Sequence, residues 1–154
     1  MTAMIISRTS QYAIQALIYL ATQPGGRPVL SRDIACGLGV PPPYMAKVLQ
    51  GLCRGQLLDS TRGRRGGFKL RGGAEHTNLL EVVLLTDGPR VDRECLLGLK
   101  ACQDETACPM HRNWKSVKKD IHACLGGITL RHLAKAVQSG QYRLADLPQG
   151  FASH

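Results

Sequence analysis

Three cysteines and one histidine in the segment 95–111 have the residue types and the spacing of metal ligands. They follow the pattern Cys95-x6-Cys102-x5-Cys108-x2-His111. Thiolates and imidazole are ligands for zinc and for iron, and a short segment that contains a glycine can wrap all four around one centre. The pattern therefore predicts a metal site that holds either zinc or an iron–sulfur cluster.

The spacing alone leaves other interpretations open. CCCH zinc fingers place three cysteines and a histidine at similar intervals and bind RNA, but they stack bases on aromatic side chains. No Phe, Tyr or Trp occurs between Cys95 and His111, which disfavours RNA reading. A zinc-stabilised nucleic-acid-binding protein and a cluster-free regulator that senses redox state through thiols both remain alternatives.

The length and composition limit the class of protein. The chain has 154 residues, enough to bury a core without disulfides, and its first residues lack the apolar run of a signal peptide. No stretch reaches transmembrane length, so we expect a cytoplasmic protein with reduced thiols and no membrane partner. Phosphate-binding loops, nucleophile elbows and HExxH helices are absent from the sequence, and we expect no enzyme activity.

Basic residues concentrate in one part of the chain. The formal net charge is +9, and the segment 47–71 carries +6 of it, with seven basic residues and one acidic residue. A local basic excess is typical of a face that docks on a polyanion. Nucleic acid is therefore the expected partner.

Around this segment the sequence predicts a helix-turn-helix. Apolar residues recur at helical spacing in 7–21, and a shorter helix follows from Ser31, which we expect to be its N-cap, to the glycines 37 and 39. A third helix begins at the prolines 41–43 and ends at Gly55. Its N-terminal end, with Tyr44 and Lys47, is the part that a recognition helix inserts into the major groove.

The residues after the third helix predict a β-hairpin. Segments 57–61 and 68–71 have the composition of short strands, and they flank the turn 62–67, whose glycines permit positive φ. Arg62, Arg64 and Arg65 project from this turn. A helix-turn-helix followed at once by an arginine-tipped hairpin indicates a winged helix, in which the hairpin reaches the DNA backbone or minor groove.

The C-terminal half predicts three more helices. Residues 78–86 have a capping box at their start, a long amphipathic helix begins near Trp114 and ends at the glycines 126–127, and a short helix spans 129–139. The long helix carries Trp114, Val117 and Ile121 on an apolar face, with Lys118 on its polar face. Either a symmetric partner or the chain's own domain would cover the apolar face. Cys36, Cys53 and Cys124 lie in helical apolar patterns and are predicted to be core residues.

We therefore expect a mainly α fold with a small β-hairpin wing. The expected organisation is a winged helix-turn-helix domain at 1–88, a cluster-binding loop at 89–111, a dimerisation helix and a short terminal helix at 112–140, and a disordered tail at 141–154.

Several motifs together resemble the IscR and NsrR family of bacterial transcription regulators. These are Ser7–Ala13, Tyr44 in the third helix, the wing Arg62-Gly63-x-x-Gly66-Gly67-Phe68, the segment Leu80–Val83, and the Cys-Cys-Cys-His pattern followed by Trp114. Members of the family are homodimeric winged-helix repressors or activators whose affinity for DNA depends on an iron–sulfur cluster.

The resemblance implies Cys95, Cys102 and Cys108 as cluster ligands with His111 as the fourth, as in the IscR branch, and favours a 2Fe-2S cluster over 4Fe-4S, with zinc as the alternative. It implies that Tyr44, Lys47 and Arg62 lie near DNA. From their charge we expect Arg8, Arg64 and Arg65 to contact DNA as well, and from the symmetry of helix-turn-helix dimers we expect a palindromic promoter site. The chain departs from the family in its six-residue first interval, in Pro43 and Ala46 of the recognition helix, and in Gln11 where the nitric-oxide-sensing branch has a carboxylate. The signal that is sensed, whether iron or cluster status, redox state or nitric oxide, stays open.

Overall fold

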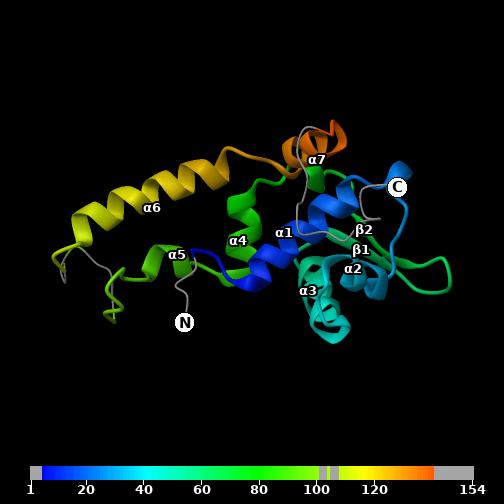
Figure 1. Cartoon of the computed structure of the whole chain (residues 1–154), viewed down its shortest axis with the longest axis horizontal. Coiled ribbons are helices and arrows are strands. Elements are labelled where there is room, and N and C mark those ends of the chain that lie inside the picture. The colour runs from blue at the N-terminus through cyan, green and yellow to red at the C-terminus, as the bar shows by residue number, and fades with distance from the viewer. Residues whose placement is uncertain (1–4, 101–103, 105–107, 141–154) are drawn as a thin grey trace.

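The computed structural model describes residues 5–100, 104 and 108–140, and divides into two regions (Figure 1). We call residues 5–87 and 128–140 the body, and the described residues of 88–126 the arm. The long helix of the arm extends to one end of the molecule, and the wing hairpin extends at the opposite end. The predicted tail at 141–154 and Cys102 lie outside the described residues.

Helix α1 (Arg8–Ala21) is the central helix of the body. Ser7 caps its start, because the Ser7 Oγ accepts a hydrogen bond of 3.0 Å from the Ser10 N–H. Its apolar residues recur at steps of three and four, so Ala13, Leu17 and Leu20 face the core and are almost fully buried.

Helices α2 (Ser31–Leu38) and α3 (Pro42–Arg54) form the predicted helix-turn-helix. Gly39 ends α2 in the left-handed conformation, with φ of 65°, and Pro42 stands in the first turn of α3, where no amide donor is needed. Ser31 is the first residue of α2 rather than its cap, so that prediction was wrong: Leu30 occupies the N-cap position without a side-chain hydrogen bond.

The wing consists of β1 (Leu58–Thr61) paired antiparallel with β2 (Gly67–Leu70). A third segment joins it, because Val29 and Phe68 exchange backbone hydrogen bonds of 2.9 and 2.8 Å. Gly67, at φ of 132°, lies so close to the Val29 carbonyl that a Cβ there would overlap it. Glycine is thus required at position 67 for two reasons: the Val29 backbone leaves no room for a Cβ, and the positive φ disfavours other residues.

Helix α4 (Leu79–Asp87) starts with the predicted capping box, in which Asn78 and Glu81 each bond the other's backbone N–H at 2.9 Å. Helices α5 (Arg90–Arg93) and α6 (His111–Gly126) belong to the arm. Short 3-10 turns at Pro24–Gly26 and Ala74–His76 complete the body with α7 (Leu130–Gln138).

Helix α7 returns from the arm to pack on α1. Two backbone hydrogen bonds fix its start, from the Leu79 N–H to the Ile128 carbonyl at 3.0 Å and from the Leu130 N–H to the Thr77 carbonyl at 2.9 Å. Leu130 and Ala134 lie in the core of the body. The chain thus passes out through the arm and comes back beside its starting point.

This architecture confirms the predicted fold class, a mainly helical winged helix with a long additional helix. The prediction that Cys36 and Cys124 are core residues was wrong, because both are exposed, while Cys53 is half-buried. Periodicity placed them beside apolar neighbours but did not fix which side of the stripe faces inward. Within the described part of the chain, no helix has the length and apolar character needed to span a bilayer.

Candidate metal centre and DNA-binding surface

Cys95 and Cys108 come together in the arm, with 3.8 Å between their Sγ atoms. Two thiolates that share one tetrahedral metal at about 2.3 Å stand about 3.8 Å apart. The same separation is far longer than the roughly 2.0 Å of a disulfide bond. The pair therefore has the spacing of two ligands on a single zinc or iron atom.

The turn after Cys95 surrounds its sulfur with backbone amides. Hydrogen bonds from the Leu99 and Leu97 N–H groups lower the pKa of the Cys95 thiol, and the Cys108 thiol and the Gly98 N–H lower it further, against partial desolvation. Gly98 takes a φ of 76°, the left-handed conformation that lets the chain fold back on the sulfur. Successive amides that converge on one atom favour an anion, here the thiolate that binds metal.

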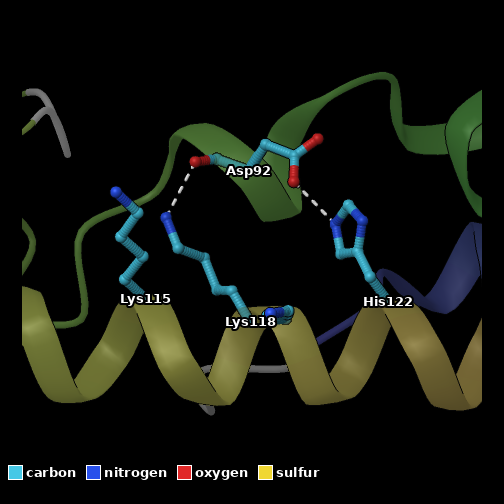
Figure 2. Close-up of a pocket in the computed structure, with 5 residues that line it drawn as sticks. Asp92, Lys115, Lys118 and His122 are labelled. Atoms are coloured by element: carbon cyan, nitrogen blue, oxygen red, sulfur yellow. Dashed lines mark hydrogen bonds and ion pairs between the residues drawn. The ribbon is translucent and has the colours of Figure 1, made fainter.

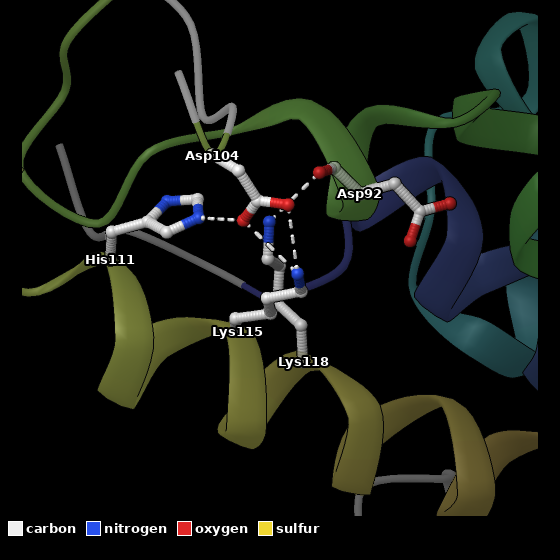
Figure 3. Close-up of polar contacts among 5 residues, drawn as sticks. All are labelled: Asp92, Asp104, His111, Lys115 and Lys118. Carbon is white, nitrogen blue, oxygen red and sulfur yellow. Dashed lines mark hydrogen bonds and ion pairs between the residues drawn. The ribbon is translucent and has the colours of Figure 1, made fainter. Parts of the chain in front are cut away.

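His111 is the first residue of α6 and lies close to the cysteine pair in sequence. Its Nε2 is 2.8 Å from Asp104 Oδ1, and the same carboxylate accepts hydrogen bonds of 3.0 and 3.1 Å from Lys115 Nζ (Figure 3). The His111 hydrogen bond, followed by Lys115, lowers the pKa of Asp104. This carboxylate orients the imidazole, as outer-shell partners of metal-binding histidines do.

A second polar cluster holds the arm together where α5 faces α6. Lys118 Nζ donates 2.8 Å to the Asp92 carbonyl, and His122 Nε2 lies 2.6 Å from Asp92 Oδ1 (Figure 2). Trp114 Nε1 donates 3.0 Å to the Glu94 carbonyl, one residue before Cys95. Asp92, Lys118 and His122 line a cavity of about 270 Å³ together with Lys115 and Lys119.

Neither Asp92 nor Asp104 belongs to a sequence motif, because both act through contacts across the arm. Lys118 was predicted on the solvent side of the long helix, and this was wrong: the residue is 9% exposed, because its amine reaches the Asp92 carbonyl. A long side chain can bury its stem in this way while its charge finds a polar partner.

The donors that the structure describes fit a metal, without forming a complete site. In residues 5–100, 104 and 108–140, no three His, Cys, Asp or Glu side chains gather closely enough to hold an ion. The predicted third thiolate, Cys102, is outside these residues. The ligand set of Cys95, Cys102, Cys108 and His111 therefore stays a prediction, supported by the spacing of the Cys95–Cys108 pair.

The predicted DNA-binding residues belong to three elements of the body. Arg8 is at the start of α1, Lys47 is in the second turn of α3, and the other three cations extend from the wing turn. All five cations, Arg8, Lys47, Arg62, Arg64 and Arg65, are exposed. Tyr44 differs from them, because it is half-buried and its hydroxyl is hydrogen-bonded to Thr9 Oγ1.

Apolar side chains remain exposed on the faces of α4 and α6. Leu84 is 39% exposed, Leu85 43% and Val117 44%, and α6 packs on α4. Leu96, Leu97 and Leu99 of the cysteine loop are exposed as well. Such a concentration of apolar surface is typical of an interface.

A model of the Rrf2 family, described as an iron-dependent transcriptional regulator, matches residues 6–136. The chain belongs to the Rrf2 family. The match includes the arm and all of the body except Ile5 and residues 137–140, and it confirms the resemblance to this family that the motifs indicate. The chain is therefore a transcriptional regulator with a DNA-binding fold and not an enzyme.

Relatives of this Rrf2 protein carry the same class of name. An HTH-type transcriptional regulator of Aquifex aeolicus is 31% identical over 132 residues, which are 84% of this chain and 91% of the relative. The HTH-type transcriptional regulator IscR of Xenorhabdus nematophila is 29% identical over 132 residues, 86% of this chain and 80% of the relative.

Two solved structures resemble this chain in fold. CymR of B. subtilis, the global cysteine regulator of that bacterium, has a TM-score of 0.70 at 24% identity and covers 84% of this chain and 95% of its own. IscR of T. potens has a TM-score of 0.69 at 24% identity, with coverage of 99% and 98%. At this identity the likeness shows the winged-helix fold with its long helix.

Proposed function

We propose that this Rrf2 protein is a homodimeric DNA-binding regulator whose affinity or specificity for promoter DNA is controlled by an iron–sulfur cluster. Cys95, Cys102, Cys108 and His111 would hold the cluster, with 2Fe-2S favoured. The observation that carries the proposal is the 3.8 Å pair of Cys95 and Cys108, the distance between two ligands of one tetrahedral metal. IscR is also the name of several relatives.

The residues of the arm suit such a group in three ways. The amides that follow Cys95 lower the pKa of its thiol and so favour the thiolate, the form that binds metal. Asp104 holds the His111 ring in one orientation, and Trp114 fixes the carbonyl that precedes Cys95. A bound cluster would supply one-electron redox chemistry and a centre that oxygen or nitric oxide can attack.

A second copy of the chain is the partner that we propose for the apolar face of the arm. Val117 on α6 and Leu84 and Leu85 on α4 are exposed in one chain, although α6 lies against α4. A two-fold dimer would cover them and place two recognition helices on the half-sites of a palindrome.

DNA contact is proposed through Tyr44 and the exposed cations Arg8, Lys47, Arg62, Arg64 and Arg65. Neutralising about six phosphates implies an affinity loss of about a thousandfold over a fourfold rise in salt. The measurement is the salt dependence of binding to a duplex selected from a random pool with the full-length protein. Arg62→Ala should weaken binding and lower the slope, whereas Arg90→Ala, in the arm, should leave the slope unchanged.

Anaerobic purification with metal and sulfide analysis tests the cofactor. We expect iron and acid-labile sulfide with visible absorption, and loss of both in the Cys95→Ala, Cys102→Ala, Cys108→Ala triple variant. A colourless protein with stoichiometric zinc would overturn the cluster and favour the zinc alternative.

The Cys95–Cys108 pair also supports a second candidate, a cluster-free thiol sensor. Hydrogen peroxide would take two electrons and the two thiol protons, its O–O bond would break to give two molecules of water, and the two sulfurs would join in a disulfide. The sulfurs would have to approach from 3.8 Å to about 2.0 Å. Mass spectrometry of the metal-free protein after peroxide treatment detects this pairing, and Cys36→Ser is the control.

A further inference from the structure

We propose that the first turn of α1 couples the cysteine loop to the recognition helix α3, with Thr9 and Asp87 as positioning residues for DNA reading. The inference rests on the proposed function, because it concerns how a change at the cysteines reaches the DNA-reading helix. Thr9 contacts α3, while its neighbours Ser7 and Ser10 contact the end of α4.

Thr9 fixes the recognition helix through Tyr44. The Thr9 hydroxyl and the Tyr44 hydroxyl form a hydrogen bond, and the ring of Tyr12, one turn further along α1, meets the Tyr44 ring edge-on at 6.0 Å. Tyr44 is the third residue of α3. The end of the helix that enters the major groove is thus held from α1.

Asp87 fixes the same turn of α1 from the other side. Its Oδ2 accepts a hydrogen bond of 2.9 Å from the Ser7 N–H, and its Oδ1 accepts one from the Ser7 hydroxyl. A carboxylate at this position also satisfies the positive end of the helix dipole. Asp87 therefore acts as a two-pronged clamp on the start of α1.

A second contact beside the clamp is buried. The Thr86 hydroxyl donates its single proton to the Val82 carbonyl at 3.0 Å. In its hydrogen bond with Ser10, Thr86 Oγ1 is therefore the acceptor and the Ser10 hydroxyl is the donor. Ser10 is 0% exposed, and breaking this contact would leave a polar group unsatisfied in the core. The end of α4 and the start of α1 consequently move together.

Only a short segment separates this clamp from the cysteine loop. Asp87 precedes Cys95 by eight residues, and the intervening α5 and Glu94 are held to α6 through the carbonyls of Asp92 and Glu94. A rearrangement at Cys95 that shifts α5 would therefore pull on Asp87. The displaced carboxylate would loosen Ser7, and with it the turn that positions Tyr44.

The first experiment decides whether the Tyr44 hydroxyl positions the helix or reads a base. DNA affinity is measured for Thr9→Val, Tyr44→Phe and the double variant on the duplex selected with the full-length protein. If the hydroxyls act through each other, each variant loses about fivefold, the size of one hydrogen bond, and the double loses no more. Additive losses would overturn the positioning role.

Two further variants separate this effect from general destabilisation. Thr9→Ser keeps the hydroxyl and should restore wild-type affinity. Thr22→Val removes a hydroxyl that donates 2.7 Å to the Tyr19 carbonyl at the opposite end of α1, and should leave DNA affinity unchanged. A loss of equal size in Thr22→Val would mean that any damage to α1 lowers DNA affinity.

The second experiment tests the coupling itself. The ratio of DNA dissociation constants between cluster-containing and chelated protein is measured for wild type, Asp87→Asn and Asp120→Asn, an exposed carboxylate of α6. We expect Asp87→Asn to bring the ratio toward one while iron per chain stays unchanged, and Asp120→Asn to keep the wild-type ratio. Ser7→Ala should also bring this ratio toward one, and it replaces Asp87→Asn in the experiment if that variant is unstable.

The outcomes distinguish the two proposals. A wild-type ratio that Asp87→Asn and Ser7→Ala both retain would overturn the coupling and leave the cluster-gated function standing. A ratio of one in the wild type would overturn that function and the coupling with it, whereas the Thr9 and Tyr44 variants would still decide how α3 is positioned.

Discussion

The body and the arm of this regulator are stabilised by different means. The body buries leucines, isoleucines and alanines around α1, and its turns are fixed by caps and by glycines in close backbone contact. The arm is held by polar contacts of Asp92, Glu94 and Asp104 with α6, while Leu96, Leu97, Leu99 and Val117 stay exposed.

This difference indicates a division of labour. The body is held by contacts among its own residues, so we expect it to stay folded whatever the state of the arm. The exposed apolar face and the two converging thiols of the arm suit the second chain and the metal group that we propose as its partners. Substitutions should therefore affect the two regions in different assays.

The largest expected effect concerns the metal group of the arm. Cys95→Ser removes one of the two thiolates that stand 3.8 Å apart, and it should abolish iron and sulfide binding while the body stays folded. Metal analysis and circular dichroism measure the two properties. Cys36→Ser, at an exposed thiol of α2, should bind as much iron as the wild type. Full iron retention by Cys95→Ser would contradict the assignment.

Gly67→Ala should destabilise the body rather than the arm. A Cβ at Gly67 would overlap the Val29 carbonyl, and φ of 132° is strained for alanine, so we expect unfolding to become easier by about 3 kcal/mol. Urea denaturation measures this difference. Gly72→Ala, where a Cβ meets open space, should be nearly neutral. Equal stability of the two variants would show that the wing does not need this close approach.

Val117→Glu tests the dimer face of the arm. Burying an unpaired carboxylate in an apolar interface costs several kcal/mol, so the dimer dissociation constant should rise by about 100-fold with little change in the body. Sedimentation equilibrium gives the constant. Lys119→Glu adds a carboxylate on the opposite side of α6, so it should raise the dimer dissociation constant less than Val117→Glu does. An unchanged constant in Val117→Glu would exclude this face from the interface.

Trp114→Phe should have the smallest effect. The substitution keeps a six-membered aromatic ring but removes the pyrrole ring with its Nε1 donor to the Glu94 carbonyl. We expect the arm alone to lose about 1 kcal/mol of stability. Hydrogen exchange should quicken around Cys95 and stay unchanged in α1. Faster exchange throughout the body would mean that arm and body unfold as one unit.

Local signals in the sequence predicted most of the body. Three features act on their immediate neighbours in the chain: the capping box of Asn78 and Glu81, the prolines that start α3, and the glycines of the wing. The local structure that each produces can therefore be predicted from the sequence alone. The contact of Val29 with Phe68 could not be predicted from the sequence, because the two residues lie far apart in the chain and the residues around Val29 show no strand pattern.

The candidate site was only partly predictable for the same reason. Spacing identified Cys95 and Cys108, and the structure brings their sulfurs together. Asp92 and Asp104 carry no motif, and their roles arise from where α6 lies against α5. The four-residue α5 is too short to show a periodicity, and Lys118 became a buried donor because a carbonyl lies within its reach.

Control of DNA binding by the cluster is tested by measuring the DNA affinity of one anaerobic preparation before and after chelation, at constant salt. Iron, sulfide and zinc are counted in both samples. We expect the selected duplex to bind with a different dissociation constant once iron and sulfide are removed, and reconstitution to restore the first value. Identical affinity in the two states, in a sample shown to contain the cluster, would contradict this expectation.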